Sequence, residues 1–345
     1  MELQPDDPTG DWTESGVFEV APGVYRIPLP LPGDGLRAVN VYAILDRDEL
    51  VLIDSGWAIE SARELLVSAL RALDRELGDV QRFLVTHVHR DHYSQAIAVR
   101  NEFGTRVSLG RGEEPSLRTL AEQGRKARML REESLLAHGA EPLVREFRAM
   151  TAAAPEPDPL DWSLPDDWFE GPGTEQLRGR ALDVVPTPGH TQGHVVFVDA
   201  PNNLLFAGDH VLPRITPSIG FEVAKAELPL RDYLDSLRLV RGMPDRRLLP
   251  AHGSVTGSVH QRVDELLEHH SRRLDDMAGV VHAGASTAYE AARSLTWTRR
   301  ERKLDELDVF NQFLAVHETA AHLDLLVYQG KLDSALVNSV REYTP

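Results

Sequence analysis

The feature of this sequence that most constrains its fold is a cluster of potential metal ligands at residues 87–92, His-Val-His-Arg-Asp-His. The compact apolar run before it, residues 80–86, is typical of a buried strand. Two histidines spaced by one residue at a strand end can turn toward one metal ion, and Asp91 and His92 can reach a second. Because only 14 of the 345 residues are histidine, chance gives this spacing on the order of once in several hundred such sequences. We therefore predict a metal site rather than a polar surface loop.

The composition narrows the chemistry of that site. The chain has no cysteine, which excludes disulfides, thiolate metal sites and cysteine nucleophiles. Histidine, aspartate and glutamate remain as the strong metal ligands. The formal net charge of −17 disfavours binding to nucleic acid, because an acidic surface repels phosphate backbones.

Hydropathy indicates a globular protein outside the membrane. The chain is 42% hydrophobic and 26% charged, as expected for a soluble domain. No stretch approaches the roughly 18 uninterrupted apolar residues of a membrane helix. The first thirty residues lack a basic region followed by an apolar run, so we expect no signal peptide and a cytoplasmic location.

Strand and helix patterns alternate in a way that predicts an α+β fold. Two strand-rich halves with helices between them suggest two packed sheets covered by helices. We divide the chain into an N-terminal arm (1–16), a catalytic domain (17–280) with a helical insertion at about 113–175, and a small helical domain (281–345). Within the insertion, residues 113–150 show charges interleaved with leucines, which favours helix.

Further segments reveal a family resemblance. Residues 87–92 match the HxHxDH signature of the metallo-β-lactamase superfamily. Four other segments resemble motifs of that family in the same order: VLIDSG at 51–56, TPGHTQGH at 187–194, LFAGD at 205–209 and LPAHG at 249–253. The match as a whole covers roughly residues 17–255. The resemblance implies an αββα sandwich of two mixed β-sheets flanked by helices.

The resemblance also implies a dinuclear site. By position, the first metal would be held by His87, His89 and His190. The second would be held by Asp91, His92 and His252, and Asp209 would bridge the two. Such ligands suit two zinc ions, with iron or manganese also possible. Asp91 is the candidate catalytic residue, because it could orient the bridging hydroxide.

Other polar residues are weighed individually. Asp54 resembles a residue that orients a metal-binding histidine, with a plain turn aspartate as the alternative. For His194 a hydrogen bond near the site and a packed structural role are equally open, and His210 could face either pocket or core. The pair His269-His270 is assigned to a solvated helix face rather than a second metal site. The remaining histidines show no ligand spacing and are expected to be ordinary: His138, His260, His282, His317 and His322.

The motifs most resemble the glyoxalase II-like hydrolase branch. This implies an enzyme in which a metal-bridging hydroxide attacks a carbonyl of a small-molecule thioester, ester or lactone. The alternatives are a phosphodiesterase or RNA endonuclease with the same dinuclear site, an iron-dependent oxidoreductase of the same fold, and a DNA-binding regulator. The regulator would leave seven ligands without a purpose, and a secreted β-lactamase would need an export signal.

The insertion and the C-terminal segment are each expected to have a role in addition to that of the metal site. We expect the insertion to cover the metal cleft and shape the acyl or leaving-group pocket, with decoration or a dimer contact as the alternative. The tail resembles a small winged-helix-type domain. Acidic residues offset its basic Arg299-Arg300 cluster, so packing or dimerisation is preferred over DNA reading. The expected partner is a small-molecule substrate, not nucleic acid or membrane, and a homodimer is left open.

Overall fold

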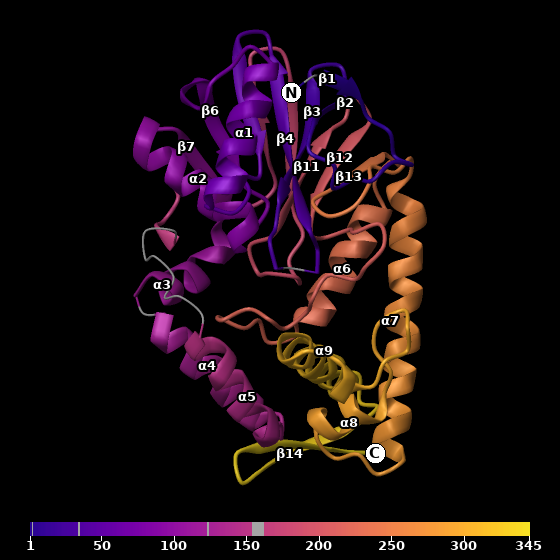
Figure 1. The fold of residues 1–345 in the computed structure, drawn as a ribbon. Coiled ribbons are helices and arrows are strands. Elements are labelled where there is room, and N and C mark those ends of the chain that lie inside the picture. Colours follow the sequence, from indigo (N-terminus) through magenta and orange to yellow (C-terminus); the bar gives the residue numbers. More distant parts are fainter. Residues whose placement is uncertain (2, 34, 123, 154–161) are drawn as a thin grey trace.

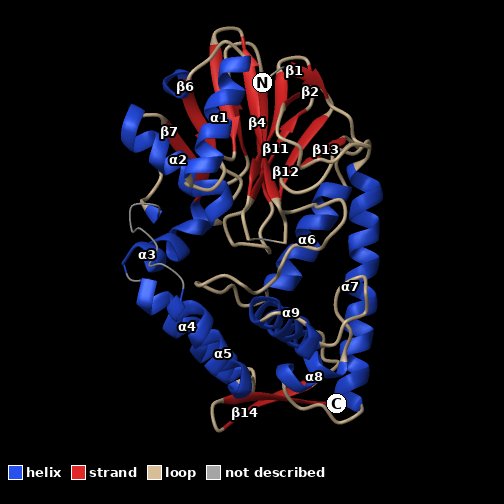
Figure 2. Ribbon diagram, in the orientation of Figure 1, coloured by secondary structure: helices blue, strands red, loops and turns tan. Residues whose placement is uncertain are grey.

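The computed structural model describes residues 1, 3–33, 35–122, 124–153 and 162–345, and two β-sheets form the upper half of the molecule in Figures 1 and 2. The first sheet has eight strands, which neighbour one another in chain order. Strands β2 to β5 are antiparallel, whereas β5 to β8 are parallel. The strands are β1 (Leu3–Pro5), β2 (Val17–Ala21), β3 (Val24–Pro30), β4 (Ala38–Asp46), β5 (Glu49–Ile53), β6 (Val80–Leu84), β7 (Arg106–Gly110) and β8 (Asp167–Phe169).

The second sheet has five strands in the order β13-β12-β11-β10-β9. Its neighbours are antiparallel except for β12 and β13, which are parallel. Both sheets are therefore mixed, as predicted. The strands are β9 (Gly173–Gln176), β10 (Ala181–Pro186), β11 (Val195–Asp199), β12 (Leu204–Gly208) and β13 (Arg247–Pro250).

Strand β4 shows why the sheets stack. Its side chains alternate between two apolar clusters, because successive residues of a strand face opposite sides of the sheet. Val39 and Val41 join the cluster that includes Leu66. Tyr42 and Ile44 join the cluster shared with the second sheet. Because both faces of β4 are covered, its sequence is mostly apolar. The apolar side chains on the inner faces of the two sheets hold the sheets together.

Helices cover the outer faces and complete the predicted αββα sandwich. Helix α1 packs on the first sheet through Leu66 and Leu70, while α6 and α7 cover the second through Leu234 and Val263. No helix in the described part of the chain is both long and apolar enough to cross a bilayer. The α-helices are α1 (Glu60–Ala72), α2 (Arg90–Phe103), α3 (Glu114–Glu122), α4 (Gly124–Ala137), α5 (Glu141–Ala153), α6 (Pro229–Arg241), α7 (Val259–His282), α8 (Ala288–Ser294) and α9 (Val309–Tyr328).

Within the predicted insertion, α3 to α5 are helical and pack against the C-terminal helix, whereas β8 and β9 lie inside its predicted bounds of about 113–175 and belong to the two sheets. Helices α3 to α5 lie with α8 and α9 below the sandwich in Figure 1. The rings of Phe147 and Phe313 stack with centroids 4.8 Å apart, and Leu135 and Leu143 belong to the same apolar cluster. The insertion is therefore part of the core rather than a removable cover. Its segment 154–161 lies outside the described residues.

Two terminal features go beyond the sequence predictions. Within the N-terminal arm, β1 pairs in parallel with β2, and Asp6 is bonded to the buried guanidinium of Arg26 at 2.7 Å. The N-terminal arm, residues 1–16, is therefore attached to the first sheet at these two points. At the other end, the chain closes in an antiparallel hairpin of β14 (Asp333–Val337) and β15 (Val340–Thr344). Helix α7 runs across the predicted boundary near residue 280, and a winged-helix-like unit stays a prediction.

Candidate metal centre

All seven predicted ligands lie at one edge of the sandwich, because the strands that deliver them end there. Strand β6 leads to His87 and His89, and α2 carries Asp91 and His92 in its first turn. Strands β10, β12 and β13 run in the same direction within the second sheet. Their carboxyl ends deliver the remaining three ligands: His190, Asp209 and His252.

The first group of ligand atoms comprises three imidazole nitrogens and one carboxylate oxygen. Nε2 of His87 and Nε2 of His190 each lie 3.0 Å from Nδ1 of His89. A tetrahedral zinc ion with bonds near 2.0–2.1 Å separates its ligand atoms by about 3.3 Å. The observed spacing thus fits ligands converging on one ion.

The second group is formed by Asp91, His92 and His252. Oδ2 of Asp91 lies 3.5 Å from Nε2 of His92 and 3.4 Å from Nε2 of His252. Both Nε2 atoms are buried and have no hydrogen-bond partner in the described structure. Buried nitrogens without a partner are costly unless they bind something, so this group also fits a cation.

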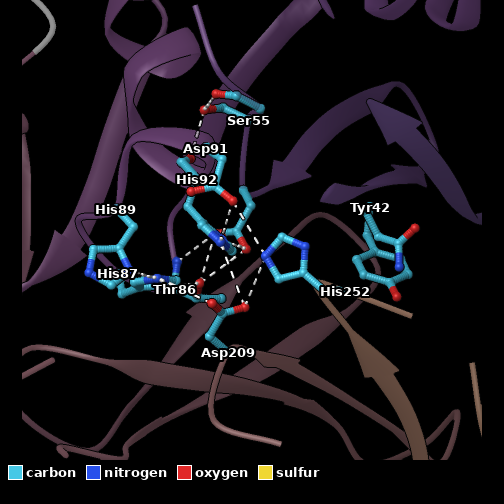
Figure 3. Close-up of polar contacts among 12 residues, drawn as sticks. Tyr42, Ser55, Thr86, His87, His89, Asp91, His92, Asp209 and His252 are labelled. Atoms are coloured by element: carbon cyan, nitrogen blue, oxygen red, sulfur yellow. Dashed lines mark hydrogen bonds and ion pairs between the residues drawn. The ribbon is translucent and has the colours of Figure 1, made fainter. Parts of the chain in front are cut away.

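Asp209 faces both groups at once. Its Oδ2 lies 3.5 Å from Nε2 of His190, whereas its Oδ1 lies 3.4 Å from Nε2 of His252 and 3.7 Å from Nε2 of His92. Figure 3 shows Asp209 below His92 and His252, with contacts to both. A carboxylate with one oxygen toward each group would suit a residue shared by two cations.

Hydrogen bonds on the far side of two ligand rings fix the direction of their ligand atoms. The Nδ1–H of His190 donates to the Ser218 carbonyl, and the Nδ1–H of His252 donates to the Ala38 carbonyl, both at 2.7 Å. A ring that donates through Nδ1 presents the Nε2 lone pair to the centre. The site is therefore held in place before any ion binds.

Asp54 performs the same role for His92, as the resemblance implied. Its carboxylate accepts a hydrogen bond from Nδ1 of His92 at 2.8 Å, and it also accepts from the backbone N–H and hydroxyl of Thr86. Thr86 directly precedes His87, so a single buried carboxylate orients both parts of the motif. Asp54 holds a left-handed backbone conformation, φ 59°, to do so.

We expect Asp54→Asn to weaken metal affinity by about 10- to 100-fold while leaving the fold intact, because the amide keeps the shape but loses the charge. Competition against a chromophoric chelator would measure the affinity. Asp48→Asn, on an exposed side chain, is the matched control. Unchanged affinity in Asp54→Asn would contradict the orienting role.

The electrostatics of the centre match a cation site. Burial and the neighbouring histidines hold the pKa of His87 and His89 well below the usual value, so both rings are neutral and can donate a lone pair. Burial opposes a charge on His92 as well, yet Asp91, Asp54 and Asp209 together raise its pKa well above the usual value. This concentration of buried carboxylates around one point is what a divalent cation would neutralise.

Two further histidines near the centre are structural. Nε2 of His194 accepts a hydrogen bond from the backbone N–H of Asp209 at 3.2 Å, and its Nδ1 lies 2.9 Å from the Thr187 hydroxyl. His194 therefore supports the turn that positions the shared aspartate. His210 is fully buried against the ring of Tyr233, which places it in the core rather than in a pocket.

The assignment of His269-His270 to a solvated face was wrong for His270. It is completely buried, and its Nδ1 lies 3.1 Å from Nε2 of His322 on α9. His317 is also buried and donates from Nδ1 to the Phe313 carbonyl at 2.8 Å. Periodicity alone missed the contact between His270 and His322, because it depends on how α9 packs against α7.

The chain matches known proteins over most of its length. Residues 34–252 match the sequence profile of the metallo-beta-lactamase superfamily. The chain belongs to this superfamily. The "Probable metallo-hydrolase YqjP" of Bacillus subtilis (strain 168) is 27% identical over 333 residues, which cover 90% of this chain and 93% of that protein.

Two solved structures resemble the whole chain. The metallo-beta-lactamase family protein TTHA1429 from Thermus thermophilus has a TM-score of 0.74 and 27% identity, covering 94% of this chain and 99% of that one. A beta-lactamase domain protein from Burkholderia ambifaria has a TM-score of 0.77 and 27% identity, covering 98% and 96%. Together with the His/Asp cluster, the family makes this chain a metal-dependent hydrolase that binds divalent metal.

Sequence reasoning missed a buried acidic pair beside the centre. Glu113, from the start of the insertion, accepts a 2.5 Å hydrogen bond from the hydroxyl of Thr191. Glu222 accepts from the backbone N–H of Gln192 at 3.0 Å. The two carboxylates thus hold the loop that carries His190. No motif or spacing signalled them, because the two glutamates lie more than a hundred residues apart in the sequence.

Proposed function

We propose that this protein is a dinuclear hydrolase, with two zinc ions, that cleaves the acyl bond of a small-molecule thioester, ester or lactone. The observation that carries the proposal is the division of Asp209 between the two ligand groups. Its Oδ2 faces His190, and its Oδ1 faces His252. A single-ion site would not need a carboxylate aimed both ways.

The roles of the chain's own residues follow from this arrangement. Bound divalent cations would supply a water of lowered pKa and would polarise the oxygen of the bond to be cut. Asp91 is the most accessible of the ligand carboxylates, with 19% of its side chain exposed against 10% for Asp209. Its greater exposure suits it to orient a water molecule toward a substrate.

Charge favours an acyl substrate over a nucleic acid. A cavity of about 120 Å³ beside the His190 loop is lined by Glu222 and Asp232, among others. The net charge of −17 would repel a polyanionic backbone. A small substrate enters without that penalty.

The deciding experiment combines elemental analysis of the purified protein with a panel of thioesters, lactones, β-lactams and phosphodiesters. We expect two zinc ions per chain and turnover confined to carbonyl substrates. Activity on phosphodiesters alone would overturn the substrate class. Iron with no hydrolysis would replace the proposal with an oxidoreductase of the same fold.

A further inference from the structure

A small pocket lies where the insertion, the C-terminal helix and the loop after Asp209 meet, and several polar side chains reach its mainly apolar lining. Arg131 and Ser134 reach it from α4, His317 from α9, and Phe221 and Lys225 from the loop. It admits about 10 Å³, the room of one water-sized group. One oxygen atom of an anionic group fits this space, with the rest of that group lying outside it.

Arg131 supplies an unpaired positive charge to this pocket. Within the described part of the chain, its guanidinium has no carboxylate partner, and its buried Nε has no hydrogen-bond partner. The guanidinium carbon lies 5.1 Å from the centre of the Phe221 ring. Because most arginines of this acidic chain form ion pairs, a partly buried arginine without one is available for a ligand.

Phe221 connects Arg131 to the metal centre. The Phe221 ring contacts that of His89 edge to face, with centroids 5.6 Å apart. The charge of Arg131 also contributes to lowering the pKa of His89, after burial and the effect of His190. The pocket is thus one aromatic ring away from the first group of ligands.

A chain of hydrogen bonds positions a second cation, Lys225. His317 donates through Nδ1 to the Phe313 carbonyl, and burial holds its pKa well below the usual value. The ring is therefore neutral, and its Nε2 accepts from the Ser134 hydroxyl at 2.7 Å. The Ser134 oxygen in turn accepts from the Lys225 ammonium, which leaves the two other ammonium N–H groups for a ligand.

One carboxylate, Glu222, also lines the pocket. Its oxygens accept hydrogen bonds from the Ser116 hydroxyl and the Gln192 N–H, and burial raises its pKa to about 7. Glu222 is thus already committed to holding the His190 loop. Glu222 therefore neutralises little of the positive charge of Arg131 and Lys225, and this charge can attract an anionic ligand.

We propose that Arg131 and Lys225 form an anion subsite that binds a carboxylate or phosphate at the far end of the substrate's acyl chain. The inference deepens the proposed function and rests on it: a substrate whose reacting carbonyl lies at the metal centre extends past Phe221, and its anionic end meets the two cations. The insertion helix α4 then determines substrate choice through Arg131.

The test compares two thioesters of one leaving group, N-acetylcysteamine, that differ only in the charge of the acyl end: glutaryl and pentanoyl. We expect the wild-type zinc-loaded enzyme to prefer the glutaryl ester in kcat/KM. Arg131→Gln should lower the ratio of the two kcat/KM values by about 10- to 100-fold, the value of a charge-assisted hydrogen bond. Arg131→Lys should retain part of the preference.

Arg128→Gln is the matched control, since Arg128 lies on the same helix and donates to the Thr151 carbonyl. It should keep the wild-type ratio. Equal use of both esters by the wild type, or a ratio unchanged in a folded, metal-replete Arg131→Gln, would overturn the subsite.

Calorimetry separates this inference from the proposed function. Glutarate should bind the zinc-loaded protein more tightly than pentanoate, and Arg131→Gln should abolish the difference, even if no thioester is hydrolysed. In a parallel arm, 4-phosphonobutanoate distinguishes a phosphate-type end group, if it binds more tightly than glutarate, from a carboxylate. Equal binding of all three acids would refute the subsite, whatever the activity panel shows.

Discussion

Asp209→Asn is expected to lower kcat/KM by at least about 10³-fold, which corresponds to roughly 4 kcal/mol of lost transition-state stabilisation. The two carboxylate oxygens face different ligand groups, at 3.5 Å from Nε2 of His190 and 3.4 Å from Nε2 of His252. An amide offers one oxygen and no charge, so it cannot serve both groups. We expect the metal content to fall from two ions per chain toward one.

Elemental analysis and steady-state kinetics on the same preparation would check this result. The matched control is Asp235→Asn, because Asp235 is exposed on α6 and forms an ion pair with Arg238 on the same helix. The backbone N–H of residue 209 still donates to His194 in the variant, so the turn should survive. If Asp209→Asn kept both ions and stayed within tenfold of wild-type activity, the shared role of Asp209 would be wrong.

The fold and the ligand positions could be read from the sequence because the motifs fix local geometry. Residues 87–92 follow a buried strand, and the later motifs follow β10, β12 and β13. The family resemblance implied which seven residues share the site, and the strand ends show how the chain brings them to the same edge. The αββα layers followed from the same strand and helix patterns, through the family that they resemble.

The supporting contacts could not be read in this way, because they join residues far apart in the chain. The Nδ1 of His252 donates to the Ala38 carbonyl, and a backbone carbonyl leaves no trace in the sequence. In the sequence, Arg131 is one of several charged residues in a charged helix. Its position over the Phe221 ring depends on how α4 packs. His270 was misplaced for the same reason, since its partner His322 lies on a helix packed from the C-terminal end.

Two segments of backbone pack so closely near His190 that a side chain between them would strongly destabilise the protein. The end of β7 lies against the backbone of the His190 loop: a Cβ at Gly110 would stand 1.8 Å from the Gly193 carbonyl oxygen. A Cβ at Gly112 would stand 2.5 Å from the carbonyl oxygen of Gln192. In both cases the obstacle is backbone, which cannot rotate away. Only glycine permits this packing.

We therefore expect Gly110→Ala to destabilise the protein by about 3 kcal/mol or more, at or beyond the upper end for overpacking. The loop must move to admit the methyl group, and His190 moves with it, so the first ion should be lost more readily than the second. Urea unfolding and metal titration would measure the two effects. Gly171→Ala is the control, because nothing lies within 4 Å of a Cβ there. A Gly110→Ala variant with wild-type stability would show that the two loops can separate, and His190 would then not be held by this packing.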